Sequence, residues 1–122
     1  MGSYRVVVAE DNSDTRAMVK WLLEQHGFKV DTAADGVAAL KLIAQCIPDL
    51  ILTDIQMPNL SGIDLIKRLR QDRKTEKTPV VAMSAYGPNE LEKASAAGAN
   101  VIIRKPEDIM DLAETVRSLL PA

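Results

Sequence analysis

Five residues of this 122-residue chain carry side chains that can together hold a divalent cation and a phosphoryl group. Glu10 and Asp11 form an acidic pair, and Asp54 supplies a third carboxylate. Carboxylate oxygens are suitable ligands for Mg²⁺, which keeps several waters and takes further ligands from phosphate. Ser84 adds a hydroxyl donor and Lys105 a compact positive charge. If the fold gathers these residues, they predict a magnesium-dependent phosphoryl site.

Each of these residues lies one or two positions after the end of a short apolar run. The runs are rich in β-branched residues and bounded by turn formers or charges, which is typical of buried strands. They cover residues 6–9, 50–52, 80–83 and 101–103. Residues 29–33 instead alternate between polar and apolar, which predicts a fifth strand with one wet face or a place at the sheet edge.

The segments between the runs show helical spacing of apolar residues. The clearest stripe, at the carboxyl end, comprises Ile109, Leu112, Ala113, Val116, Leu119 and Leu120. The first helix shows Thr15, Met18, Val19, Leu22 and Leu23. The pattern repeats over residues 40–44 and 65–69, and a weaker one occupies residues 91–97. Strict alternation of strand and helix predicts an α/β fold, a doubly wound parallel sheet whose ligand crevice lies at the carboxyl ends of the strands.

The proposed site has structural alternatives, residue by residue. Acidic residues after strands often cap helices, although Asn12 and Ser13 are better placed than Asp11 to cap the first helix. Ser84 alone would fit a turn, and Lys105 alone a solvated surface. If the first and third strands are neighbours, however, carboxylates about 4 Å apart repel by about 4 kcal/mol per pair at an effective dielectric of 20. A cation must then compensate, which favours the site.

Composition limits the function classes. Fifteen basic and seventeen acidic residues give a net charge of −2, which disfavours direct binding to nucleic acid. The apolar runs are too short to cross a membrane and no signal pattern begins the chain, so a cytoplasmic location is expected. The lone Cys46 suits a reducing compartment, and we expect it to be a small buried hydrophobe near a helix end. We expect a single domain over residues 1–122, with its core at about 4–120.

The chain closely resembles the receiver domains of two-component response regulators from about Tyr4 to Leu120. The resemblance rests on five motifs: Glu10-Asp11, Asp54-Ile55-Gln56-Met57-Pro58, Gly62, Ser84-Ala85 and Lys105-Pro106. It implies a flavodoxin-like (βα)5 fold with strand order 2-1-3-4-5.

The resemblance also implies a role for each site residue. Asp54 would accept a phosphoryl group from a phosphohistidine of a sensor histidine kinase or histidine phosphotransfer domain. Asp11, Asp54 and the main-chain carbonyl of Gln56 would bind Mg²⁺, with Glu10 acting directly or through water. Lys105 would pair with Asp54 and then with a phosphoryl oxygen, and Ser84 would contact another. The chain would thus be a signalling switch that catalyses only its own phosphorylation and dephosphorylation.

The phosphoryl donor is expected to be external. His26 is the only histidine and lies at the end of the first predicted helix, so we expect it to be structural.

The expected output surface combines the fourth helix, fifth strand and fifth helix, which the family uses for effectors or for dimers formed on phosphorylation. Many receivers carry Tyr or Phe where this chain has Ile102, so Ser84 and Tyr86 are the remaining switch candidates. Glu107 stands where Phe is frequent. The bond between Lys105 and Pro106 is expected to be cis by analogy.

Three other functions stay open on the sequence. A pseudo-receiver would keep the fold and only bind proteins, but all five reactive residues are present here. An aspartyl-phosphate hydrolase usually needs a second aspartate where this chain has Gln56. A flavodoxin-like cofactor binder would need a glycine-rich phosphate loop. The sequence is compatible with a stand-alone receiver, or with one excised from a hybrid kinase or larger regulator.

Overall fold

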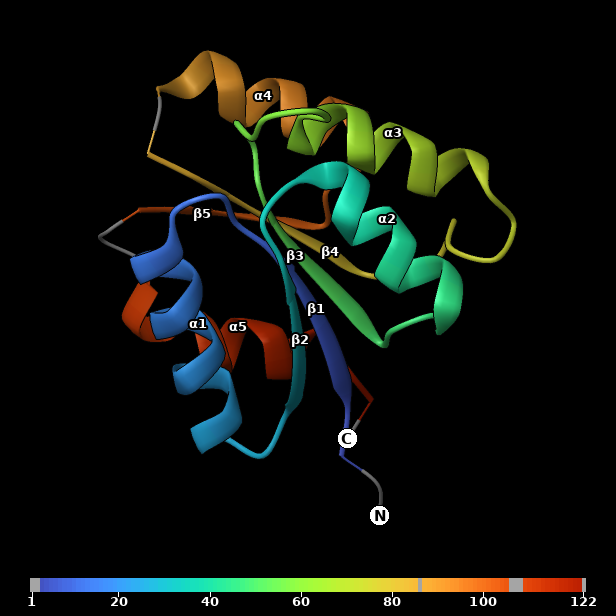
Figure 1. Cartoon of the computed structure of the whole chain (residues 1–122). Helices are drawn as coiled ribbons and strands as arrows, with labels where there is room; N and C mark the ends of the chain where they lie inside the picture. Colours follow the sequence, from blue (N-terminus) through green and yellow to red (C-terminus); the bar gives the residue numbers. More distant parts are fainter. Residues whose placement is uncertain (1–2, 86, 106–108, 122) are drawn as a thin grey trace.

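A five-stranded parallel sheet between two layers of helices forms the computed structural model, which describes residues 3–85, 87–105 and 109–121 (Figure 1). The elements are β1 (Arg5–Ala9), α1 (Ser13–Gln25), β2 (Lys29–Ala33), α2 (Gly36–Gln45), β3 (Leu50–Asp54), α3 (Gly62–Gln71), β4 (Val80–Ser84), α4 (Pro88–Ala97), β5 (Val101–Arg104), the 3₁₀ helix η1 (Ile109–Asp111) and α5 (Leu112–Ser118). The strand order β2-β1-β3-β4-β5 confirms the predicted fold.

The central strands are buried on both faces. β1 and β3 pair in parallel from Val6 opposite Leu50 to Ala9 opposite Thr53, and every residue of β3 is buried. β2 lies at one edge of the sheet, with Lys29 and Asp31 exposed and Val30 buried between them, which confirms the predicted edge position. β3 and β4 extend beyond their apolar runs to include Asp54 and Ser84, so both residues end strands.

Two apolar cores form because successive side chains of a strand point to opposite faces. Val6 and Val8 pack with α1 and α5 on one face, whereas Val7 and Ala9 pack with α2, α3 and α4 on the other. Figure 1 shows these two helical layers on either side of the sheet. The carboxyl ends of the strands lie between these layers, and Asp54 and Ser84 are the last residues of β3 and β4.

Polar side chains begin three of the helices. Asn12, Asp35 and Ser61 each accept the main-chain N–H three residues later, at 2.9, 2.8 and 3.2 Å. These bonds satisfy donors that a helix start leaves unpaired. The predicted cap at Asn12 is confirmed, so Asp11 is not the capping residue of α1.

Three details of the sequence interpretation are wrong. Cys46 is exposed, because it lies at the C-cap of α2, beyond the turn that packs on the sheet. Met18 is 45% exposed, since Val19 and Leu23 already supply the buried contacts of α1; Trp21, one turn later, is 60% exposed. The last helix is shorter than its stripe: its first turn is η1, and α5 ends at Ser118.

Arg70 ties the end of α3 to the loops that precede β4 and β5. Its guanidinium donates hydrogen bonds of 2.8–3.3 Å to main-chain oxygens of Thr75, Glu76, Thr78 and Gly98 and to the Asn100 side chain. Asn100 Oδ1 also accepts the N–H of Val80 at 2.8 Å. We call this group of contacts the Arg70 cluster. It lies at the amino ends of β4 and β5, opposite the edge where Asp54 and Ser84 end their strands.

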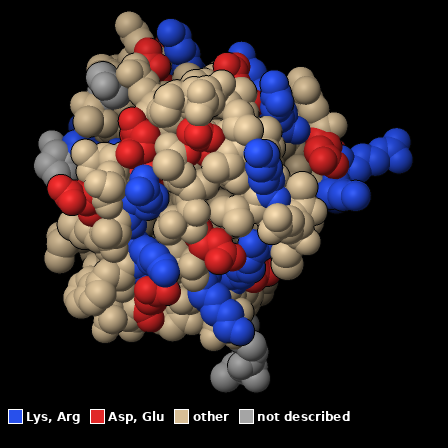
Figure 2. All heavy atoms as spheres, viewed as in Figure 1, with Lys and Arg blue, Asp and Glu red and all other residues tan. Residues whose placement is uncertain are grey.

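Acidic and basic side chains are interspersed on the face shown in Figure 2. This mixture agrees with the near-neutral net charge of −2. None of the helices in the described part of the chain is long and apolar enough to span a membrane.

Candidate functional site

Four strands bring the predicted site residues to one edge of the sheet. Asp54 ends β3 and Ser84 ends β4, whereas Glu10 directly follows β1 and Lys105 directly follows β5. Because the strands are parallel neighbours in the order β1-β3-β4-β5, their carboxyl ends lie side by side. Asp11 follows Glu10 and joins the group from the turn that leads into α1.

Three carboxylates converge at this edge. One oxygen from each of Glu10, Asp11 and Asp54 lies within 4.8 Å of the other two. Glu10 and Asp54 are buried and Asp11 is exposed. Mg²⁺ binds oxygens at about 2.0–2.1 Å, so it spans ligand oxygens up to about 4.2 Å apart. Three carboxylate oxygens lying this close together are a donor set that fits such an ion.

Lys105 compensates the charge of the two buried acids. Its ammonium group contacts Glu10 Oε1 directly and lies 3.3 Å from Asp54 Oδ2. Only 15% of its side chain is exposed. The ammonium group thus bridges two carboxylates that would otherwise repel each other in a place with little water.

The ion pairs and burial shift the protonation of this group. Burial raises the pKa of Glu10 from 4.5 to about 7; the hydrogen bond from Lys105 lowers it, and the nearby Asp54 raises it further. For Lys105, burial lowers the pKa, but the hydrogen bond to Glu10 and the charges of both acids outweigh burial, so its pKa is raised. Without a metal ion, Glu10 therefore titrates near neutral pH while Lys105 stays charged.

Main-chain contacts hold Asp54 in place. Its Oδ1 accepts the N–H of Ile55 at 2.8 Å, and its main-chain oxygen accepts the Thr53 hydroxyl at 2.9 Å. Gly62, the first residue of α3, packs directly on this strand end: a Cβ there would lie 1.9 Å from the main-chain oxygen of Asp54. The Gly62 N–H also donates to Ile55 O at 2.8 Å. Only glycine allows α3 to begin this close to Asp54.

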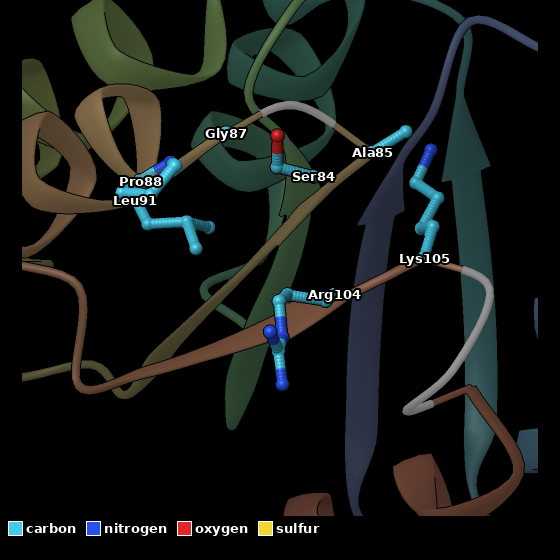
Figure 3. A pocket seen from close by; sticks show the side chains of 7 residues that line it. All are labelled: Ser84, Ala85, Gly87, Pro88, Leu91, Arg104 and Lys105. Atoms are coloured by element: carbon cyan, nitrogen blue, oxygen red, sulfur yellow. The ribbon is translucent and has the colours of Figure 1, made fainter.

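Ser84 lines a cavity of about 240 Å³ beside the acidic cluster. The other lining residues are Ala85, Gly87, Pro88, Leu91, Arg104 and Lys105. Figure 3 shows the Ser84 hydroxyl and the Lys105 side chain directed toward the same side, whereas Arg104 points the other way. The main-chain oxygen of Ser84 accepts the N–H of Lys105 at 2.9 Å, which fixes the two strand ends relative to each other.

The other residues singled out in the sequence lie outside this cluster. Gln56 is exposed in the β3–α3 loop, and its carbonyl stays a predicted ligand. Ile102 of β5 is half-buried against the core beneath α2, α3 and α4. Tyr86 and the bond from Lys105 to Pro106 lie outside the described residues, as does Glu107.

His26 is remote from the acidic cluster along the strands. It is the exposed C-cap of α1, and its Nδ1 lies 2.9 Å from Leu22 O. It borders a cavity with Tyr4 and Phe28, next to the amino ends of β1 and β2. This position agrees with a structural role rather than that of an internal phosphoryl donor.

Two supporting residues escaped the sequence interpretation. Thr53 is a buried hydroxyl between the apolar residues of β3 and Asp54, and its position directly before Asp54 was a usable signal. Arg16 of α1 donates from Nη1 to Glu10 O at 2.9 Å. Its acceptor is a main-chain oxygen, so residue types and spacing gave no sign of this contact.

Comparison with known proteins identifies the family. The family model of the response regulator receiver domain matches residues 6–117. Over 116 residues the chain is 33% identical to the polar-differentiation response regulator DivK of Brucella ovis, which covers 94% of each protein. It is also 33% identical to the phosphate regulon transcriptional regulatory protein PhoB of Rhizobium meliloti, over 95% of this chain and 52% of PhoB.

The fold agrees with this match. The chemotaxis response regulator CheY4 of Vibrio cholerae superposes with a TM-score of 0.89 at 28% sequence identity, covering 97% of this chain and 99% of CheY4. By its sequence, its strand order and the residues at its strand ends, this chain belongs to the family of response regulator receiver domains.

Proposed function

We propose that the chain is a magnesium-dependent phosphoacceptor and that its Asp54 is the residue that receives the phosphoryl group. The observation that carries the proposal is the convergence of three carboxylates within 4.8 Å, two of them bridged by the ammonium group of Lys105. Catalysis of phosphoryl transfer depends mainly on positioning and on electrostatic stabilisation. A fixed positive charge beside the attacking carboxylate provides both.

The donor is a phosphohistidine on a sensor histidine kinase or histidine phosphotransfer domain. A carboxylate oxygen of Asp54 forms a bond to phosphorus while the bond from phosphorus to the imidazole nitrogen breaks. The imidazole leaves with the electron pair and takes up a proton. Asp54 can attack because its Oδ1 is oriented by the Ile55 N–H and its Oδ2 faces Lys105.

The metal ion would be held by Asp11, Asp54 and the Gln56 carbonyl, with Glu10 acting directly or through water. Bound Mg²⁺ supplies positive charge that offsets the repulsion between the carboxylate and the incoming phosphoryl oxygens. Lys105 then passes from its two carboxylates to one phosphoryl oxygen, and the Ser84 hydroxyl donates to another. The same residues support hydrolysis of the aspartyl phosphate, so the chain catalyses only its own modification.

The output is a change in the surface formed by α4, β5 and α5. Each new charge-assisted hydrogen bond is worth roughly 1.5–3 kcal/mol, which is sufficient to shift a two-state equilibrium about tenfold or more. Ser84 carries the coupling, because it lies both at the acidic cluster and on the cavity that reaches α4. Ile102 leaves this strand without an aromatic switch. The surface binds an effector protein or a second phosphorylated copy.

Acetyl phosphate tests the proposal directly. The intact chain is incubated with it, with and without Mg²⁺, and the adduct is read by intact mass. We expect one phosphoryl adduct that requires Mg²⁺, is lost in Asp54→Asn and persists in Asp64→Asn, a matched change at an exposed residue of α3. No adduct in any protein would indicate a pseudo-receiver, and turnover of many phosphate esters would indicate a hydrolase.

A further inference from the structure

Arg16 lies in the first turns of α1, next to the turn that carries two of the three acids. Its Nη1 donates to Glu10 O at 2.9 Å and is 3.5 Å from Asp11 O. The side chain is half-buried, and its own main-chain N–H donates to Asn12 O at 2.9 Å. One guanidinium thus reaches back over the helix start to both residues of the acidic pair.

Two other polar groups of Glu10 already have partners. The Glu10 N–H donates to Ala33 O at 3.0 Å, and Glu10 Oε2 accepts the N–H of Asn12 at 3.1 Å. Within the described residues, by contrast, no hydrogen bond or ion pair holds the Asp11 carboxylate. Its position is therefore set by the main chain, and the Arg16 contacts fix the peptide groups on either side of it.

We propose that Arg16 is a positioning residue that holds the turn from Glu10 to Asn12 so that the Asp11 carboxylate meets the metal ion. The inference rests on the proposed magnesium site. The two possible effects of Arg16 on Mg²⁺ affinity have opposite signs. Positioning of Asp11 strengthens Mg²⁺ binding, whereas the positive charge of Arg16 near the site repels the cation and weakens binding. Loss of positioning must weaken Mg²⁺ binding, whereas loss of charge alone must strengthen it.

Titration of the intact chain with Mg²⁺ alone separates the two effects. Isothermal titration calorimetry compares the parent with Arg16→Gln, which removes charge and fork, and Arg16→Lys, which keeps the charge. We expect the dissociation constant to rise about tenfold or more in Arg16→Gln and by less in Arg16→Lys, as for other residues that orient metal ligands. Tighter binding by Arg16→Gln with unchanged binding by Arg16→Lys would overturn the inference.

Lys20→Gln is the matched control, because it removes the same charge from the same helix at a surface pair with Glu24. It should change the dissociation constant by less than about twofold. Weakening equal to that of Arg16→Gln would also overturn the inference, since it would assign the effect to helix charge.

Hydrogen exchange of the metal-free protein gives an independent measurement. The amides of Glu10 and Asn12 should exchange faster in both Arg16 variants, while the amide of Gly62, bonded to Ile55 O, serves as reference. Unchanged exchange at the turn would contradict positioning even if one variant were too unstable to titrate.

Phosphorylation by acetyl phosphate distinguishes failure of this inference from failure of the proposed function. At saturating Mg²⁺ the Arg16 variants should reach the parental extent of labelling, since positioning affects only metal affinity. A labelled parent whose variants bind Mg²⁺ normally would reject the role of Arg16 alone. A parent that neither binds Mg²⁺ nor becomes labelled would reject the function, and with it the metal-directed role of Arg16.

Discussion

Two partly buried basic side chains, Arg70 and Lys105, lie at opposite ends of the strands of the sheet, and their surroundings differ. Arg70, at the amino ends of β4 and β5, donates to neutral oxygens of five residues. Burial lowers the pKa of Arg70. Lys105, at the carboxyl ends, faces two carboxylates that would repel each other without it, and its pKa is raised.

The difference indicates that the amino ends of the strands contribute to stability, whereas the carboxyl ends are arranged for reaction. Neutral acceptors in the Arg70 cluster do not change with pH or ligands, so its contacts can be satisfied once and kept. The acids around Lys105 can gain a proton, a metal ion or a phosphoryl group, and each gain changes what Lys105 should contact. The arrangement of side chains at the carboxyl ends of the strands therefore changes with protonation and with bound ligands, because no single arrangement pairs its charges in every state.

The largest effect should come from Arg70→Met. This change leaves several main-chain oxygens at the loop ends without their donor, and we expect the free energy of unfolding to fall by about 3–4 kcal/mol, independently of pH. Urea denaturation measures the change. Arg73→Met, at an exposed loop position, is the control and should stay within about 0.5 kcal/mol. A cost for Arg70→Met as small as the control would remove the contrast between the two edges.

Gly62→Ala should cost nearly as much at the reactive edge. The new Cβ would lie 1.9 Å from the main-chain oxygen of Asp54, so β3 or α3 must move, and we expect a loss of about 2–3 kcal/mol. Asp54 should also be labelled more slowly by acetyl phosphate. In Gly87→Ala the Cβ meets no atom within 4 Å, so this control should cost about 1 kcal/mol or less. Equal losses of stability in the two variants would show that the close contact of Gly62 with the main-chain oxygen of Asp54 does not determine the cost of Gly62→Ala.

The metal-free protein should lose stability as pH rises from about 4.5 to 7. Folded Glu10 has a raised pKa, so over this range the folded state binds more protons than the unfolded state, and deprotonation disfavours folding. The shift from 4.5 to about 7 sets an upper limit of about 3 kcal/mol. We expect about 1–2 kcal/mol, because water and Lys105 relax around the charge.

Urea denaturation in the presence of EDTA, at several pH values, measures this loss. Lys105 contributes no slope in this range, because its raised pKa acts only at alkaline pH. Glu10→Gln should flatten the profile. A flat profile for the parent would mean that the ion pair with Lys105 offsets the cost of burying the Glu10 charge. The stability contributed at the two ends of the strands would then be equally independent of pH.

The smallest effect is a fraction of a proton released when Mg²⁺ binds near pH 6.5. A cation beside Glu10 favours its charged form, so binding should expel the proton that Glu10 holds below about pH 7, and Mg²⁺ affinity should fall on acidification. Calorimetry in two buffers of different ionisation enthalpy measures the release, and Glu10→Gln should abolish it. Equal heats in both buffers for the parent would place Glu10 away from the metal ion.

The sequence predicted the parts of this molecule that depend on residue type and order. Apolar runs and their alternation with helices predicted the parallel sheet, and the residues after each run predicted which side chains meet at its carboxyl edge. The polar pattern of β2 predicted a strand with one wet face or a place at the sheet edge, and β2 is an edge strand. These features follow from burial and from the geometry of parallel strands, both of which are readable from spacing.

Other features depend on main-chain groups or on exact helix ends, which spacing does not encode. The contacts of Arg16 and Arg70 are mostly to carbonyl oxygens, so no residue pattern indicates them. The direct contact of Lys105 with Glu10 depends on the conformations of two long side chains, which spacing also does not encode. The exposure of Cys46 and Met18 depends on where α2 ends and how much of α1 the sheet covers.

The exposed indole of Trp21 has a practical consequence. It is the only tryptophan of the chain and is 60% exposed on α1, so its fluorescence reports water at this helix without any attached dye. A protein that covers this side of α1 would shift the emission to shorter wavelengths. One that binds elsewhere on the surface, away from α1, would leave the emission unchanged, so a single spectrum recorded during each titration gives a first map of where a newly found partner docks.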